Sequence, residues 1–234
     1  MQISSAILIG AGGTGQHLAA PLIRLLKYHN SGTNQFSVYD GDVFEEHNGE
    51  RQIGVDGDKT AALDKLLSLQ GLKAKMHPAY MTKERLTQLI RRNQNYSGAL
   101  LVVAAVDNDA TRKMCIETLT ESDCDFIFVT PGNSDATDPE ASIKGNVLWY
   151  GCVDGQKVGV NPILLVPNIE KPDDFIPRRG GCMEHAPSTP QLIAANALAA
   201  AYTLTVVQGL LDEQMPLEAS HLFFNGRNMT LTAN

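Results

Sequence analysis

The N-terminal part of the chain reads Ala6-Ile7-Leu8-Ile9-Gly10-Ala11-Gly12-Gly13-Thr14-Gly15, which is the strongest indication of the fold in the sequence. The apolar run predicts a strand, the glycines predict a tight turn, and the leucine spacing over Gln16–Tyr28 predicts a helix. In this context glycines let the backbone approach a phosphate, and the helix N-terminus stabilises its charge. The stretch therefore predicts a nucleotide-binding turn, with a tight turn that binds no ligand as the alternative.

Apolar runs and helical patterns alternate downstream. Strands are expected at Phe36–Tyr39, around Ala74–His77, at Leu100–Val106 and at Phe126–Val129, and helices at Lys59–Leu69, Lys83–Arg92 and Ala110–Leu119. The uninterrupted run Leu100–Val106 is typical of a central parallel strand that is covered on both faces. The alternation predicts a doubly wound, Rossmann-like α/β fold with a mostly parallel sheet.

The pattern changes after Pro131. The polar stretch Asn133–Pro139 predicts a loop. Turn dipeptides favour two hairpins, Val147–Val153 with Asp154-Gly155, and His221–Phe224 with Asn225-Gly226 and Met229–Thr232, so the C-terminal strands are expected to be antiparallel. Glu170–Pro190 lacks periodicity and is expected to be a long crossover loop. We expect one domain over residues 1–234, with a nucleotide-binding half at 1–131 and a second half at 132–234.

Composition excludes several classes of protein. The net charge of −7 argues against a nucleic acid as partner, because phosphate contacts require clustered cations. The four cysteines form no C-x-x-C pair, which argues against a disulfide scaffold or a thiolate zinc site and, with no signal-peptide pattern, favours a cytoplasmic location. The uncharged stretch Leu192–Leu211 is long enough to cross a membrane, yet its alanines and polar residues favour a buried core helix, so no membrane is expected.

Charged residues follow the predicted strands. Asp40, after the second strand, is where a ribose hydroxyl would be accepted, which leaves both NAD and ATP open. The segment Asp40-Gly41-Asp42-Val43-Phe44-Glu45-Glu46-His47-Asn48-Gly49-Glu50-Arg51-Gln52 follows, then Lys59 at the start of a helix, then Asp107-Asn108 after the fourth strand. Together with the glycine turn, this order resembles the ThiF, MoeB and ubiquitin-activating enzyme family, whose pattern is G-x-G-G-x-G, D-x-D, N-x-x-R-Q, Lys and Asp.

The resemblance implies a reaction and a site. In that family a protein C-terminal carboxylate attacks the α-phosphate of ATP, which gives an acyl adenylate and pyrophosphate. By similarity Asp40 holds the ribose, Asn48, Arg51 and Lys59 hold the phosphates, and Asp107 binds Mg²⁺. The other residues implied at the cofactor site are Gly10, Gly12, Gly13, Gly15, Asp42 and Gln52.

The chemistry of the residue types agrees with this reaction, which requires charge to be stabilised. Arg51 and Lys59 are cations suited to triphosphate oxygens and are expected to be exposed, while a carboxylate such as Asp107 at a strand's carboxyl end suits Mg²⁺. The alternatives are that Asp40 and Asp42 are turn residues, that both cations are solvated, and that Asp107 caps the following helix with Asn108 or Asp109.

One cysteine is a candidate acceptor. Cys182 lies in the predicted crossover loop after Arg178, Arg179, Gly180 and Gly181, whose charge would lower a thiol pKa. The resemblance places a thioester-forming cysteine in this region, and a structural cysteine is the alternative. The other three, Cys115, Cys124 and Cys152, adjoin apolar helix or strand residues and are interpreted as core or near-core residues.

The chain also departs from the family pattern. Because the glycine turn begins at Gly10, the N-terminal helices that deliver an arginine to a neighbouring protomer are not expected here, the C-x-x-C zinc motifs do not occur in the sequence, and Gly49 stands where Leu is usual. The spacing from Arg51 to Lys59 is also shorter than usual, so this is interpreted as a reduced, divergent member.

The function expected by resemblance is ATP-dependent adenylation of a small ubiquitin-like or sulfur-carrier protein, which the second half of the chain would bind. A homodimer and a downstream conjugating enzyme or sulfurtransferase are the other implied partners. Two alternatives stay open: a nucleotide-binding scaffold of the same fold without turnover, and an NAD-linked oxidoreductase, which is disfavoured because hydride transfer needs neither Arg51, Lys59 nor a metal at Asp107.

Overall fold

A computed structural model describes residues 1–29, 35–50, 52, 54, 57–133, 143–177, 192–214, 219–228 and 230–233. Within these residues, nine strands form one sheet in the order β3-β2-β1-β4-β5-β6-β8-β9, with β7 beside β6. The strands are β1 (Ile3–Ile9), β2 (Phe36–Tyr39), β3 (Lys75–His77), β4 (Ala99–Ala104), β5 (Phe126–Asn133), β6 (Lys144–Val153), β7 (Gln156–Val158), β8 (His221–Asn225) and β9 (Thr230–Ala233).

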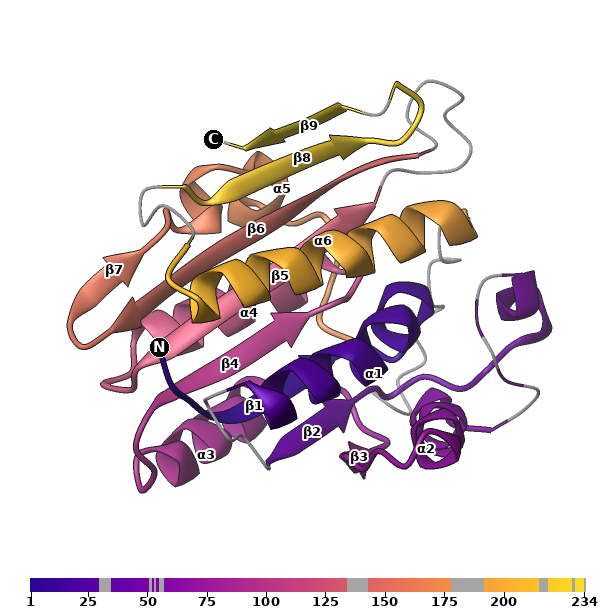
Figure 1. The fold of residues 1–234 in the computed structure, drawn as a ribbon, viewed down its shortest axis with the longest axis horizontal. Coiled ribbons are helices and arrows are strands. Elements are labelled where there is room, and N and C mark those ends of the chain that lie inside the picture. The colour runs from indigo at the N-terminus through magenta and orange to yellow at the C-terminus, as the bar shows by residue number, and fades with distance from the viewer. Residues whose placement is uncertain are drawn as a thin grey trace.

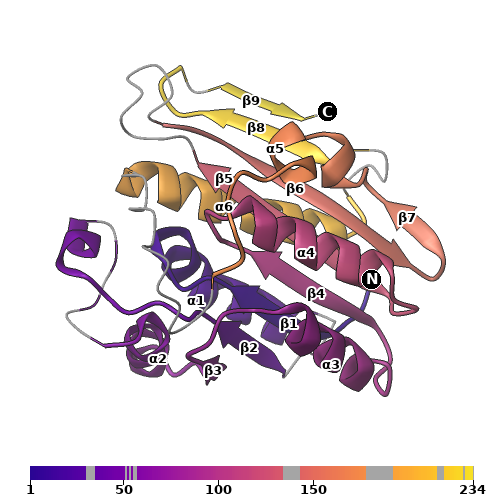
Figure 2. The same ribbon diagram turned by 180° about the vertical axis from the view of Figure 1, so that it is seen from behind.

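The first five strands are parallel and the later pairs are antiparallel, as predicted. The helices are α1 (Gly13–Tyr28), α2 (Lys59–Leu69), α3 (Lys83–Asn93), α4 (Asp109–Thr120), α5 (Pro167–Glu170) and α6 (Ile193–Leu211), with 3₁₀ turns η1 (Glu46–Glu50) and η2 (Pro162–Leu164). Figure 1 shows α1 and α6 across one face of the sheet, and Figure 2 shows α3 and α4 across the other. The structure confirms the doubly wound fold.

Strand alternation divides the core between these two faces. Leu8, Leu101 and Val103 pack toward α1 and α6, whereas Ile9 and Val102 pack toward α3 and α4. Every residue of β4 is buried, which explains why its sequence is an apolar run without alternation. From β1 the chain adds β2 and β3 on one side of the sheet, and then β4 and β5 on the other side. The topological switch point therefore lies between the parallel strands β1 and β4, and ligands of doubly wound sheets bind at such a point.

Helix α6 is long and apolar enough to cross a membrane by length and composition. Its buried residues, among them Ala199, Val206 and Leu210, belong to the same core cluster as α1. Small residues on both helices, such as Ala19 and Ala199, allow the two to pack closely. The apolar side of α6 therefore serves the core of the fold.

Element boundaries differ from the sequence expectation in places. Strands β5 and β6 pair as far as Asn133 with Gly145, beyond their apolar runs, because the antiparallel ladder continues through polar residues. The hairpin turn at Asp154-Gly155 has positive φ at both residues, as predicted. The turns η1 and η2 and the short helix α5 were not predicted, because they are too short to show a period. Within Glu170–Pro190, residues 171–177 form neither helix nor strand, and 178–190 lie outside the described residues.

Candidate functional site

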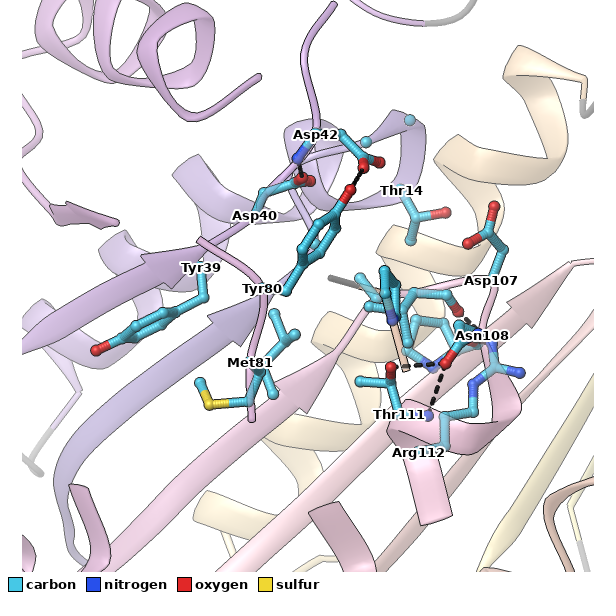
Figure 3. Close-up of a pocket in the computed structure, with 18 of the residues that line it drawn as sticks. Thr14, Tyr39, Asp40, Asp42, Tyr80, Met81, Asp107, Asn108, Thr111 and Arg112 are labelled. Atoms are coloured by element: carbon cyan, nitrogen blue, oxygen red, sulfur yellow. Dashed lines mark hydrogen bonds between the residues drawn. The ribbon is translucent and has the colours of Figure 1, made fainter. Parts of the chain in front are cut away.

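A pocket of about 380 Å³ lies at the carboxyl ends of the parallel strands. Figure 3 shows Asp40, Asp42 and Tyr80 on one side of it and Asp107, Asn108 and Arg112 on the other. The predicted site residues that line it are Gly10, Gly12, Gly13, Asp40, Asp42, Gln52, Lys59 and Asp107. The structure thus brings most of the predicted site together.

The glycine turn forms the base of the pocket. Gly10 has a φ of +98° and lies against the carbonyl of Ala105, so a side chain there would collide with the backbone. At Gly15 a Cβ would collide with the carbonyl group of Gly10, whose carbon would be 2.9 Å away. Helix α1 begins at Gly13 with no side-chain cap and no acidic residue in its first turn. Backbone N–H groups of this first turn are therefore available to bind an anion.

Asp40 is buried at the end of β2 and holds two loops together. Its Oδ2 accepts a hydrogen bond from the N–H of Ala11 at 2.6 Å, and its Oδ1 accepts one from the N–H of Asp42 at 2.8 Å. Burial, and then the charge of Asp42, raises the pKa of the Asp40 carboxyl to about 6. Asp40 therefore stabilises the turn, as the alternative interpretation held, and also lines the pocket.

Lys59 and Asp42 form an ion pair at the pocket wall. The Lys59 Nζ lies 2.9 Å from Asp42 Oδ2, and the hydroxyl of Tyr80 donates to Asp42 Oδ1. The expectation that Lys59 is exposed is wrong, since its side chain is 13% exposed, whereas that of Asp42 is 42% exposed. The backbone N–H of Lys59 also donates to the carbonyl of Asp42, which fixes the start of α2 beside this residue. The side-chain ion pair and this backbone bond together hold the ammonium group at the pocket.

Asp107 lies on the opposite wall, after β4. Its side chain is exposed and makes no hydrogen bond or ion pair with any described residue. The capping alternative falls instead to Asn108, whose Oδ1 accepts from the N–H of Thr111 at 2.7 Å. Among the described residues there is no group of three or more His, Cys, Asp or Glu side chains that would form a metal site alone. A single carboxylate still suits Mg²⁺ that is held mainly by ligand phosphates and water.

Arg112 braces this wall from α4. Its guanidinium donates to Asp109 Oδ1 at 2.6 Å, to the carbonyls of Val106 and Pro131 at 2.5 and 2.9 Å, and to Thr130 Oγ1 at 3.1 Å. These contacts tie the ends of β4 and β5 to the start of α4, as Figure 3 shows in part. The guanidinium of Arg112 therefore stabilises the pocket wall through contacts within the protein.

The segment before the undescribed crossover residues is attached to the same end of α4. Asp174 accepts hydrogen bonds from the N–H groups of Asp109 and Ala110, each at 2.7 Å, and the side chain of Asn108 donates to the carbonyl of Phe175 at 2.8 Å. Pro177, the last described residue of this segment, therefore lies at the pocket.

A polar junction joins α1, β5 and α6 behind the glycine turn. Asn196 Oδ1 accepts from Thr14 Oγ1 at 3.0 Å and from Asn133 Nδ2 at 2.7 Å. Asn133 Nδ2 also donates to Thr14 Oγ1 at 3.1 Å. Thr14 and Asn133 line the pocket, while Asn196 is fully buried.

Four predicted site residues are not among the described residues that line the pocket, namely Gly15, Asn48, Arg51 and Cys182. Arg51 and Cys182 are outside the described residues. Asn48 is buried, and its Oδ1 accepts from the N–H of Glu45 at 3.1 Å, so it stabilises η1 and is not among the pocket-lining residues. Of the other cysteines, Cys115 and Cys124 are buried, as expected, and Cys152 is half-buried. Burial raises the pKa of the Cys115 thiol to about 12, which keeps it protonated.

Sequence reasoning missed several residues that line the pocket, namely Thr14, Tyr80, Met81, Arg112 and Asn133, and also the buried Asn196 that bonds two of them. Tyr80 and Met81 follow β3, and a strand end at the sheet's carboxyl edge is itself a signal for a pocket residue. Asn133 and Asn196 carried no local signal, since their partners are distant in sequence.

Comparisons with known proteins support the fold. The chain is similar to the crystal structure of PaaA with a TM-score of 0.59 and 16% identity, covering 98% of this chain and 63% of that one. It is similar to E. coli MccB solved with AMPCPP and MccA (TM-score 0.58, 14% identity) and to E. coli MccB solved with ATP (0.55, 15%), covering 99% of this chain and 63% of each.

These identities establish likeness of fold alone, and the chain spans 63% of the length of those structures. No family model matches the sequence, and neither does any curated protein.

Proposed function

We propose that this chain is an ATP-dependent adenylyltransferase of the ThiF, MoeB and ubiquitin-activating enzyme type. It would activate the carboxylate of a small protein or peptide. The observation that carries the proposal is one pocket in which an uncapped helix N-terminus, a lysine and a carboxylate face a common space. That set suits a triphosphate with its metal ion. A dinucleotide without a metal would leave Lys59 and Asp107 without a role.

In the proposed reaction a carboxylate oxygen attacks the α-phosphorus and the bond to the β-phosphate oxygen breaks, so pyrophosphate leaves with the electron pair. The N–H groups at Gly13 and Thr14 would bind phosphate oxygens, and Asp40 would accept ribose hydroxyls. Asp107 would hold Mg²⁺, which neutralises triphosphate charge when bound. Lys59 would turn from Asp42 toward the departing charge. Arg51 and Gln52 would complete the phosphate end of the site.

One structural neighbour supports a peptide or small protein as partner, and the family resemblance adds a carboxylate as the group that is activated. MccB has been solved with MccA and an ATP analogue in one crystal. We extend this class of substrate to the present chain, with a ubiquitin-like or sulfur-carrier protein as the form that the family resemblance favours. Exchange of labelled pyrophosphate into ATP, dependent on an added carrier, tests the proposal. Absence of exchange with ATP bound would favour the scaffold alternative.

Cys182 is proposed as the acceptor of the activated carrier. It follows the pocket-lining Pro177 by five residues, a chain length of at most about 18 Å, so a thiol there is within reach of the site. Cys182→Ala is expected to retain pyrophosphate exchange and to lose a reductant-sensitive adduct on a non-reducing gel. An adduct that persists would make Cys182 structural.

We also propose a cytoplasmic homodimer, because family members pair through this domain. Light scattering at tens of micromolar tests it. A monomer that still adenylates would contradict the pairing.

Nucleotide binding is expected to weaken as the pH falls through about 6, because Asp40 must be ionised to accept ribose hydroxyls. The contribution of Asp40 to the free energy of unfolding depends on pH in the opposite direction, because it decreases as the pH rises. The folded carboxyl, with a pKa of about 6, holds its proton more tightly than the ordinary value of 3.8. Its contribution to the free energy of unfolding is therefore full below 3.8 and is lost as the pH rises to about 6.

Calorimetric titrations with ATP between about pH 5 and 8 measure the effect. Phosphate groups themselves titrate near pH 6, so the Asp40→Asn variant serves as the reference. The parent should lose more affinity on acidification than this variant does. The same dependence of ATP affinity on pH in the parent and in Asp40→Asn would show that Asp40 does not bind the ribose.

A further inference from the structure

The first turn of α1 is held in place by a residue of α6. Thr14 lies in that turn and lines the pocket, and its hydroxyl donates to Asn196 Oδ1 at 3.0 Å. Asn133, at the end of β5, donates to the same oxygen at 2.7 Å. The Oδ1 of Asn196 thus accepts a hydrogen bond from each of these two pocket-lining side chains. Asn196 and Thr14 are 182 residues apart in sequence.

Gly13 allows this approach. A Cβ on Gly13 would collide with the Asn196 amide, whose Cγ would be 2.8 Å away. The amide of Asn196 therefore packs directly against the backbone that begins α1. Any shift of α6 at this point moves the N–H groups that face the pocket.

The junction is a poor choice for stability alone. Asn196 Nδ2 and Asn133 Oδ1 are buried and find no hydrogen-bond partner among the described residues. Buried polar atoms without partners are destabilising, and a partly satisfied polar network is commonly less stable than an apolar one of the same shape. Polar groups kept at such a cost are typical of sites where geometry serves function.

We propose that Asn196 is a positioning residue for the phosphate-binding end of the pocket. It would hold Thr14 and Asn133 in register, so that the helix following residues 178–191 sets the orientation of the glycine turn. This inference rests on the proposed function for its ligand, but the junction itself is independent of which nucleotide binds.

The test compares two ligands on three variants. Asn196→Ala removes the shared acceptor, and Asn133→Ala removes one donor from the other side should the first variant fail to fold. Thr203→Val is the matched control, since Thr203 is also buried on α6 and loses one hydrogen bond, to Ala199 O at 2.7 Å, away from the pocket. Dissociation constants for ATP by calorimetry and for adenosine by ligand-observed NMR separate phosphate binding from the rest.

Asn196→Ala is expected to weaken ATP binding by about tenfold or more and adenosine binding by less than about twofold, with Thr203→Val changing neither. Equal weakening for both ligands, or none for ATP, would overturn the proposal, because a general loosening of the fold does not distinguish phosphates.

A parent that binds no ATP would refute the proposed function instead. The positioning role is then decided by amide hydrogen exchange. Faster exchange at Gln16, whose N–H donates to the carbonyl of Gly12 at 2.9 Å, in Asn196→Ala, and not in Thr203→Val, supports the role. Unchanged exchange there contradicts it.

Discussion

Replacing Lys59 with alanine is expected to lower ATP:pyrophosphate exchange by about a hundred- to a thousandfold, the usual effect of removing one transition-state electrostatic group. In the structure the Lys59 ammonium lies at the pocket wall, 2.9 Å from Asp42, with 13% of its side chain exposed. No other described lysine lines the pocket. If a bound triphosphate draws Lys59 away from Asp42, the carboxylate of Asp42 still accepts a hydrogen bond from the hydroxyl of Tyr80.

Lys65→Ala is the control, because Lys65 is exposed on the same helix and outside the pocket. The half-buried ion pair implies that Lys59→Ala also lowers the free energy of unfolding, by about 1 kcal/mol, which urea titration measures. Exchange rates within about threefold of the parent would remove Lys59 from the catalytic site. Loss of exchange in both variants would indicate damage to the fold.

Gly15→Ala is expected to destabilise the fold strongly. The new methyl group would collide with the Gly10 carbonyl, whose carbon would lie 2.9 Å away, and neither backbone segment has room to move because both are buried. Overpacking of this kind costs about 3 kcal/mol at the upper end of its usual range. The gain of about 1 kcal/mol in helix propensity does not offset it.

Urea unfolding measures this effect, with Gly49→Ala as the control. At Gly49 a Cβ would meet no atom within 4 Å, and the residue has no positive φ, so its replacement should leave the midpoint unchanged. A Gly15→Ala midpoint equal to that of the parent would mean that the turn is not packed as tightly as the structure has it.

The parallel half of the fold was predictable because its signals are local. Strand β4 is apolar throughout and Asp40 follows β2 directly, so both the sheet and one pocket residue could be inferred from position alone. Lys59 was placed correctly at the start of a helix. Its pairing with Asp42 was not foreseen, because exposure was inferred from residue type and the fold of the intervening loop decides it.

The unpredicted part of the site depends on long-range contacts. Asn196 lies in a helix whose sequence indicates only a buried apolar element, and its role appears once α6 packs on α1. Asn48 fits the family motif, yet its amide oxygen is engaged by the N–H of Glu45. A motif places residue types in order, whereas hydrogen-bond partners follow from the packing of elements.

Whether the pocket binds ATP for adenylation is best measured by calorimetry with ATP and Mg²⁺, with NAD as the competing ligand. ATP is expected to bind in a manner that depends on Mg²⁺ and is weakened by Lys59→Ala and by Asp107→Asn, whereas NAD is not expected to bind. Submicromolar binding of NAD with no detectable binding of ATP would contradict it.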